Sequence, residues 1–300
     1  MKRFIAATLL ISISVVPAVS HGDNSHFPDT QDVTVKTTKV TDSVFMLQGR
    51  GGNIAALTGP DGILIVDDDY RQVSEKLAAA LKELGSATPR YVLNTHWHTD
   101  HTEGNQFFGK DSTIVAHANV RKRLSQVNTL FGNQIPAAPA IAWPVVTYTE
   151  SMTLYLNGEE IRLVHYPNGH TDGDTVVFFE KANVVHFGDH FFVGRFPFVD
   201  LDSGGSVQGL INNLASLIGT VPADTKLIPG HGPLATHAEL KNYHQVLVET
   251  AAIVQDAMKA GKTLEEIKTA GFPEKYAEAG SGFIKTPQWI ETIYRSYSAK

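Results

Sequence analysis

The sequence predicts an α/β protein built as a four-layer sandwich, in which helices cover the outer faces of two stacked β-sheets. Two observations lead to this prediction. Apolar or alternating segments typical of strands are interspersed with amphipathic segments typical of helices. The pattern then returns in a second half of similar style, and no segment rich in Gly, Pro or Ser divides the two halves. We therefore expect residues 32–300 to form a single domain with a helical C-terminal extension.

The first half is predicted to be a sheet covered by helices. Its strands are Val33–Val40, Val44–Leu47, Ile54–Leu57, Ile63–Val66, Tyr91–Leu93 and Ile114–Val115, with a turn at 49–52. The segment Ile63–Val66 is entirely apolar, as expected of a strand that is covered on both faces. One helix is predicted over Arg71–Leu84, because apolar side chains recur on one of its faces, and another over 117–128.

The second half repeats this organisation. Strands are predicted near 145–148, 153–156 and 160–165, followed by a hairpin pair, Val176–Phe179 and Val184–Phe187, and a short strand, Leu227–Ile228. Helices are predicted over Ser206–Ile218 and Ala238–Lys259, and two shorter helices complete the C-terminal region.

Residues 1–20 are predicted to be a signal peptide. Lys2 and Arg3 give a positive start, Phe4–Val16 is an apolar run too short for an ordinary spanning helix, and Ala18-Val19-Ser20 fits a small-residue cleavage site. An uncleaved membrane anchor is the alternative. We expect a mature protein that begins near His21, has no membrane contact, and is periplasmic or secreted.

Composition narrows the possible chemistry. The net charge is −6 and no dense run of Lys or Arg occurs, so no nucleic-acid partner is expected. The chain has no Cys, which excludes disulfides, a cysteine nucleophile and thiolate ligands. It has 13 His. Any metal must therefore be held by nitrogen and oxygen donors, which suit zinc and, as lesser possibilities, iron or manganese.

The sharpest motif follows the strand Tyr91–Leu93. It is Asn94-Thr95-His96-Trp97-His98-Thr99-Asp100-His101. In extended backbone His96 and His98 would lie on the same side, where they could hold one metal together. Asp100 and His101 follow where the chain must turn, so their side chains can reach a second point. A polar loop with ordinary histidines is the alternative.

Three further clusters place a metal-ligand type of residue at successive strand ends. His170 lies in Asn168-Gly169-His170-Thr171, Asp189 lies in Phe187-Gly188-Asp189-His190, and His231 lies in Pro229-Gly230-His231-Gly232. Each cluster alone is weak. Together they predict one site at one edge of the sandwich, because strand ends on that edge bring their side chains together.

These motifs, in this order, resemble the metallo-β-lactamase superfamily from about residue 40 to 235. The resemblance implies the metallo-β-lactamase fold and two metal ions per chain. It implies that His96, His98 and His170 bind the first metal, that Asp100, His101 and His231 bind the second, and that Asp189 bridges both. It also implies that Asp67 is a buried acid that orients a ligand histidine. A plain turn cap is the alternative for Asp67.

The sequence departs from the best-known lactamases of this superfamily at Asp189, where some zinc lactamases have Cys. It also has Phe192 where those enzymes have a Lys that binds a substrate carboxylate. A bridging Asp is more typical of thioester, lactone and phosphodiester hydrolases in the superfamily. The departures lower the expectation of a specialised lactamase without removing it.

We therefore predict a secreted di-zinc metallo-hydrolase in which a metal-bridging hydroxide attacks a small carbonyl substrate, namely a β-lactam, lactone or thioester. Zinc lowers the pKa of bound water to about 7, and Asp100 is the predicted catalytic residue that orients the hydroxide and shuttles its proton. Two alternatives are an iron-dependent oxygenase or redox protein on the same fold, and a non-catalytic periplasmic metal-binding protein.

Three residues are candidates for contact with a small-molecule substrate. Arg195 could bind a carboxylate as a bidentate fork, although a surface salt bridge is an equal alternative. Phe192 could form a wall of the pocket, and His190, next to Asp189, could face it. Phe131 and Trp143 lie in or near loops and could also line the pocket.

Overall fold

The structure is a computed structural model that describes residues 32–298. Its strands form two large sheets and a small hairpin. The larger sheet contains β1 (Lys36–Lys39), β2 (Val44–Gln48), β3 (Ile54–Leu57), β4 (Leu64–Val66), β5 (Tyr91–Asn94), β6 (Thr113–His117) and β9 (Val146–Tyr148). The second sheet contains β10 (Ser151–Leu156), β11 (Glu159–His165), β12 (Thr175–Phe179), β13 (Val184–His186) and β14 (Lys226–Ile228). The hairpin consists of β7 (Asn128–Leu130) and β8 (Asn133–Ile135).

The sheets change from antiparallel to parallel pairing towards one side. In the larger sheet, β1 to β4 pair antiparallel, whereas β4, β5, β6 and β9 pair parallel. In the second sheet, β10 to β13 form three antiparallel pairs, whereas β13 and β14 pair parallel. The carboxyl ends of parallel strands meet at one edge of a sheet, so β5, β13 and β14 can deliver the residues that follow them to a common place.

Side-chain alternation creates the four layers. On β3, Ala55 and Leu57 face the other sheet, whereas Ile54 and Ala56 face α1 (Ser74–Glu83). β12 shows the same division: Val177 and Phe179 point into the space between the sheets, and Phe178 points to the helices outside. Residues that alternate in this way bury both faces of each sheet. The predicted four-layer α/β sandwich is therefore confirmed.

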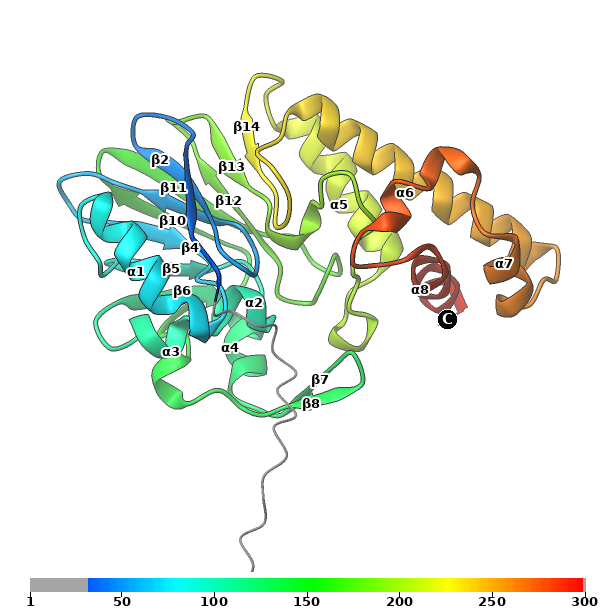
Figure 1. Cartoon of the computed structure of the whole chain (residues 1–300), viewed down its shortest axis with the longest axis horizontal. Helices are drawn as coiled ribbons and strands as arrows, with labels where there is room; N and C mark the ends of the chain where they lie inside the picture. The colour runs from blue at the N-terminus through cyan, green and yellow to red at the C-terminus, as the bar shows by residue number, and fades with distance from the viewer. Residues whose placement is uncertain (1–31, 299–300) are drawn as a thin grey trace, which may run out of the picture.

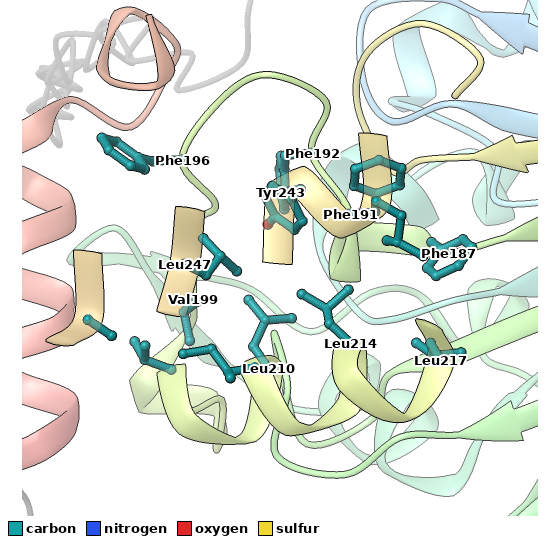
Figure 2. Packing of buried hydrophobic residues seen from close by; sticks show 14 of the residues in the cluster. Phe187, Phe191, Phe192, Phe196, Val199, Leu210, Leu214, Leu217, Tyr243 and Leu247 are labelled. Atoms are coloured by element: carbon teal, nitrogen blue, oxygen red, sulfur yellow. The ribbon is translucent and has the colours of Figure 1, made fainter. Parts of the chain in front are cut away.

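The outer helices lie on opposite sides of the sheets (Figure 1). The larger sheet is flanked by α1, α2 (Thr99–Thr102), α3 (Asn105–Phe108) and α4 (Ala118–Leu124), and the second sheet by α5 (Val207–Thr220), α6 (His237–Lys259), α7 (Leu264–Ala270) and α8 (Thr286–Ser298). Figure 2 shows Leu210 and Leu214 of α5 directed towards Tyr243 and Leu247 of α6. This second core holds the two predicted C-terminal helices, α7 and α8, against the sandwich.

The prediction of secondary structure is wrong around residues 125–135. A helix was predicted over 117–128, but α4 ends at Leu124 and the hairpin β7–β8 follows. Within residues 32–298 the strands of the hairpin pair only with each other and do not join either large sheet. Its short strands lack the alternation that marks a half-buried strand, so periodicity could not reveal them.

Two expectations concern the N-terminus and membranes. The predicted signal peptide, residues 1–20, lies outside the described residues. Within residues 32–298 the structure contains no helix with the length and hydropathy needed to span a bilayer.

Candidate metal centre

The motif after β5 brings two imidazoles together. His96 and His98 lie just beyond the strand, and His98 is the N-cap residue that precedes α2. The His96 Nε2 atom lies 3.1 Å from the His98 Nδ1 atom. The two histidines therefore face each other through different ring nitrogens, because the chain bends between them instead of staying extended.

The seven predicted ligands form two neighbouring groups. His96, His98, His170 and Asp189 compose the first group, and Asp100, His101 and His231 compose the second. Within each group, one possible ligand atom from every residue lies within 4.8 Å of the others. The structure thus brings all seven predicted residues together, with Asp189 counted in the first group and also close to the second.

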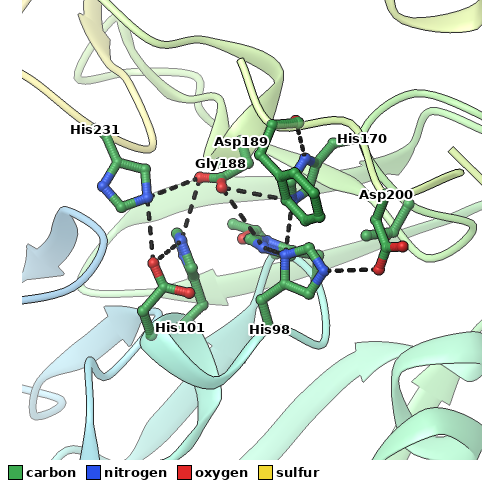
Figure 3. Close-up of polar contacts among 12 residues, drawn as sticks. His98, His101, His170, Gly188, Asp189, Asp200 and His231 are labelled. Atoms are coloured by element: carbon green, nitrogen blue, oxygen red, sulfur yellow. Dashed lines mark hydrogen bonds and ion pairs between the residues drawn. The ribbon is translucent and has the colours of Figure 1, made fainter. Parts of the chain in front are cut away.

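Asp189 lies between the two groups, as Figure 3 shows. Its Oδ1 atom lies 3.1 Å from His101 Nε2 and 3.5 Å from His231 Nε2. Its Oδ2 atom lies 3.4 Å from His170 Nε2. Each oxygen of one carboxylate thus faces a different group, which is the arrangement that a bridging ligand needs.

Outer partners fix the orientation of the histidines. The Asp67 carboxylate lies 2.7 Å from His101 Nδ1 and also accepts hydrogen bonds from the backbone N–H and the hydroxyl of Thr95. The backbone carbonyl of Phe198 lies 2.8 Å from His170 Nδ1. A proton held on the outer ring nitrogen leaves the inner nitrogen as a lone-pair donor. Asp67 is therefore placed to orient His101, as the resemblance implied.

Asp200 is an outer partner that the sequence did not reveal. Its Oδ2 atom lies 3.0 Å from His98 Nε2, while His98 Nδ1 lies 2.8 Å from His170 Nε2 (Figure 3). Asp200 comes from an irregular loop and is 102 residues from His98 in the chain. No Gly-flanked or strand-end pattern marks it, so only the folded structure could identify it.

Two orphan atoms show that the residues fit a cation. His101 Nε2 and Asp189 Oδ1 are buried and, although they lie 3.1 Å apart, neither makes a hydrogen bond within residues 32–298. Buried polar atoms in native proteins nearly always have a partner. A divalent cation could be coordinated by both atoms and would give each a partner, because neutral imidazole and carboxylate are common metal ligands.

Two glycines leave room for the side chains of Asp189 and His101. A Cβ atom at Gly230 would lie 2.1 Å from Asp189 Oδ1, and one at Gly52 would lie 2.1 Å from His101 Cε1. Real Cβ atoms do not approach so closely, so both positions require a residue without a side chain. The Pro229-Gly230-His231-Gly232 motif therefore provides both a ligand and room for the neighbouring carboxylate.

The two groups differ electrostatically. Burial lowers the pKa of His96 well below its usual value and lowers the pKa of His170 to about 4, so both rings are neutral donors. Burial would also lower the pKa of His231, but the Asp189 and Asp100 carboxylates raise it to about 9. The pKa of His101 is likewise raised well above its usual value, since nearby carboxylates outweigh its burial. Without a cation, protonated His101 and His231 therefore balance the negative charge of the nearby carboxylates.

The two groups open into a pocket of about 600 Å³. Asp100, Asp189 and His231 line it, and so do two predicted substrate-contact residues, Phe192 and Arg195. The Phe192 ring is stacked on His231 with 5.2 Å between ring centroids.

His190 is not where its prediction placed it. It does not line this pocket; it is 1% exposed, and its Nε2 atom lies 3.2 Å from Asn213 Nδ2. Neighbouring side chains at a strand end point apart, so His190 turns inward while Asp189 faces the pocket.

The sequence also suggests that Phe131 and Trp143 line the pocket. Phe131 lines the pocket, whereas Trp143 does not and instead lies near Arg121, with 5.5 Å between the guanidinium carbon and the ring centroid.

Comparison with known proteins adds independent findings. The family model for the metallo-beta-lactamase superfamily matches residues 49–240. The probable metallo-hydrolase YqgX of Bacillus subtilis is 26% identical over 184 residues, which cover 60% of this chain and 85% of that protein. The hydroxyacylglutathione hydrolase of Rhodospirillum rubrum is 26% identical over 194 residues, covering 63% of this chain and 66% of that protein. A metallo-beta-lactamase from Pontibacter korlensis has a similar fold, with a TM-score of 0.60 at 15% identity, covering 71% of this chain and 99% of that one.

Proposed function

Since the chain belongs to the metallo-beta-lactamase superfamily, we propose that it is an exported di-zinc hydrolase of small carbonyl compounds, namely lactams, lactones or thioesters. One observation carries the proposal: two ligand groups joined by Asp189 form part of the wall of an open pocket of about 600 Å³. A purely structural zinc site closes its coordination with protein ligands, whereas a pocket of this size admits a small molecule. The geometry therefore favours an enzyme over the alternative of a non-catalytic metal-binding protein.

Zinc is proposed because every donor is an imidazole nitrogen or a carboxylate oxygen. Two bound zinc ions would supply Lewis acidity, which lowers the pKa of water towards about 7 and polarises a carbonyl oxygen. A relative named hydroxyacylglutathione hydrolase supports the hydrolysis of acyl compounds.

Asp100 is proposed to handle the proton. Its Oδ2 atom lies 3.2 Å from His231 Nε2, and its side chain is 20% exposed to the pocket. The neighbouring histidines lower the pKa of Asp100 to about 2 although burial opposes this, so the group is a carboxylate at neutral pH. It can orient an attacking water, take its proton, and later give that proton to the leaving group.

Tyr70 is proposed to assist at the carbonyl oxygen. Its side chain also lines the pocket. Burial raises the pKa of Tyr70, so the hydroxyl remains protonated at neutral pH. A neutral hydroxyl can donate a hydrogen bond to an oxygen that becomes negative during attack.

A hydrolysis screen tests the function. Purified protein with zinc added would be assayed on a lactam, a lactone, a thioester and a phosphodiester, and again after chelation. We expect zinc-dependent turnover of at least one carbonyl compound. Asp100→Asn should reduce kcat by about a hundredfold or more, whereas Asp202→Asn, an exposed site, should not. Turnover of only the phosphodiester would contradict the substrate class, and iron in place of zinc would favour an oxygenase.

Export is proposed from the N-terminal sequence alone. Sequencing the N-terminus of protein from the native host should find a start near His21. Recovery of Met1 would contradict export by cleavage.

A further inference from the structure

The mouth of the pocket carries an aromatic rim, which we define as Phe131, Phe198 and Phe283. The ring centroids of Phe131 and Phe283 are 5.5 Å apart, and those of Phe131 and Phe198 are 4.3 Å apart. All three residues line the pocket. Phe131 lies at the tip of the hairpin β7–β8, and Phe283 lies between η6 (Ala279–Ser281) and α8. Phe283 is therefore outside residues 49–240, the part that matches the superfamily.

Two members of the aromatic rim are unusually open to solvent. Phe131 is 54% exposed and Phe283 is 70% exposed. A single exposed aromatic ring is ordinary, but rings that gather at the mouth of a pocket indicate a binding surface. The same pocket is also lined by the apolar side chains of Leu130, Ile135, Phe192, Phe196 and Ile284.

The backbone at Phe131 is strained in a way that points to function. Phe131 has φ 51° and Gly132 has φ 77°, and they form the two-residue loop of the hairpin. Such a loop favours Asn-Gly, and a bulky side chain with positive φ is rare. Hairpin formation gives no reason for an aromatic ring at this place. Strain that local folding does not require is found at binding sites.

The rest of the pocket provides positive charge. Apart from the predicted metal ligands, Arg50 and Arg195 are the charged residues among the described ones that line it. Both are exposed, and neither guanidinium has an ion pair within residues 32–298. Arg50 is held in place because its backbone N–H donates to Asp69 Oδ2 at 2.9 Å. Unpaired guanidinium groups beside an apolar wall suit a ligand that is both anionic and apolar.

We propose that the substrate is an amphiphilic organic anion with a flat aromatic group. The aromatic group packs against the aromatic rim, and a carboxylate or sulfonate lies near Arg50 and Arg195. In this arrangement the C-terminal extension selects the substrate through Phe283. The inference rests on the proposed function only in assuming that the hydrolysed carbonyl lies near Asp100.

Two probes of matched shape test the proposal without turnover. The dye 8-anilinonaphthalene-1-sulfonate is an aromatic anion, and N-phenyl-1-naphthylamine has the same rings without the sulfonate. Binding of each would be measured by fluorescence titration, with zinc-loaded and with chelator-treated protein. The variants are Phe131→Asn, Phe283→Ala and the double variant Arg50→Gln/Arg195→Gln. Tyr155→Ala is the control, because Tyr155 is a 73% exposed aromatic residue on β10 that does not line the pocket.

We expect each Phe variant to weaken the binding of both probes by about tenfold. The double Arg variant should weaken only the anionic probe, also by about tenfold. Tyr155→Ala should change neither. Unchanged binding of both probes to the Phe variants would overturn the proposal, as would equal losses of the two probes in the Arg variant.

Thermal unfolding separates binding from a structural role. Phe131→Asn places a residue suited to positive φ in the loop, so its Tm should equal or exceed that of the unchanged chain. A lower Tm in both Phe variants, parallel to the loss of binding, would overturn the proposal. The expected probe pattern together with no hydrolysis of any carbonyl compound would instead contradict the proposed function and leave this inference standing.

Discussion

At the scale of single residues, the outer partners are as informative as the ligands. Asp200 lies 3.0 Å from His98 Nε2 and holds that ring with Nδ1 facing the first group. Asp200→Ala should weaken zinc binding by about 10- to 100-fold, the usual effect of losing an outer partner. Asp202→Ala is the matched control, since Asp202 makes an exposed ion pair with Arg295 and is not a partner of the histidines in the part of the chain that the structure describes. Zinc titration by calorimetry checks both, and equal affinities for the two variants would refute the role of Asp200.

Protonation distinguishes the two ligand groups. The pKa of His231 is raised from 6.5 to about 9, whereas that of His170 is lowered to about 4. Below pH 9, a cation that binds the second group must displace the proton of His231. A cation that binds the first group finds His170 already neutral. Zinc at the second group should therefore bind more tightly as the pH rises from 6 to 9, with proton release. On acidification this group should lose its metal first.

The raised pKa of His231 has the opposite pH effect on the stability of the metal-free protein. A raised folded-state pKa stabilises the fold when the group is protonated in both states. The contribution of His231 is thus complete below pH 6.5 and is lost as the pH rises through about 9. Zinc titrations at several pH values check the pH dependence of zinc affinity. Unfolding of the metal-free protein at the same pH values checks the pH dependence of stability. If zinc affinity depended equally on pH at the two groups, the assignment of the raised pKa to the second group would be contradicted.

At the scale of elements, the loops after the strands shape the site. Gly230 has no room for a Cβ atom, which would meet Asp189 Oδ1 at 2.1 Å. Gly230→Ala should therefore displace that carboxylate and lower the bound zinc, although the chain still folds. Gly219→Ala is the control, because Gly219 lies in α5 with open space around it and should gain up to about 1 kcal/mol in stability. Full zinc content in Gly230→Ala would count against this steric account.

The predictability of each element follows from how local its signal is. The strand Ile54–Leu57 is predicted with the observed bounds, and the strand predicted as Val176–Phe179 is one residue shorter than β12 (Thr175–Phe179), since apolar runs between turns are local signals. The ligand motifs were recognisable for the same reason: each occupies a few consecutive residues. The hairpin β7–β8 was missed, because its form depends on the turn at Phe131 and Gly132, where Phe is an unusual residue.

Long-range contacts account for what the sequence could not predict. The bond from His98 to Asp200 spans 102 residues, and the contact of Phe131 with Phe283 joins the hairpin to the C-terminal extension. Neither pair has a local pattern. Only the packing of the two sheets and the outer helices brings these partners together.

At the scale of the whole molecule, the centre joins the two sheets. His96, His98, Asp100 and His101 follow β5 of the larger sheet, whereas His170, Asp189 and His231 lie in loops of the second sheet. Each ligand group contains residues from both. Zinc should therefore stabilise the assembled sandwich: at a hundred times its Kd, one site adds about 2.7 kcal/mol, and Tm should rise by roughly 5 °C or more. A Tm that is independent of zinc would contradict this coupling.

The central claim is that one chain holds two metal ions bridged by Asp189, and zinc analysis tests it most directly. Elemental analysis of the zinc-reconstituted protein should find close to two zinc ions per chain. The Asp189→Ala variant, in which the carboxylate facing both groups is removed, should retain about one, with an unchanged circular dichroism spectrum. At most one zinc ion in the unchanged chain, or two in Asp189→Ala, would contradict the account.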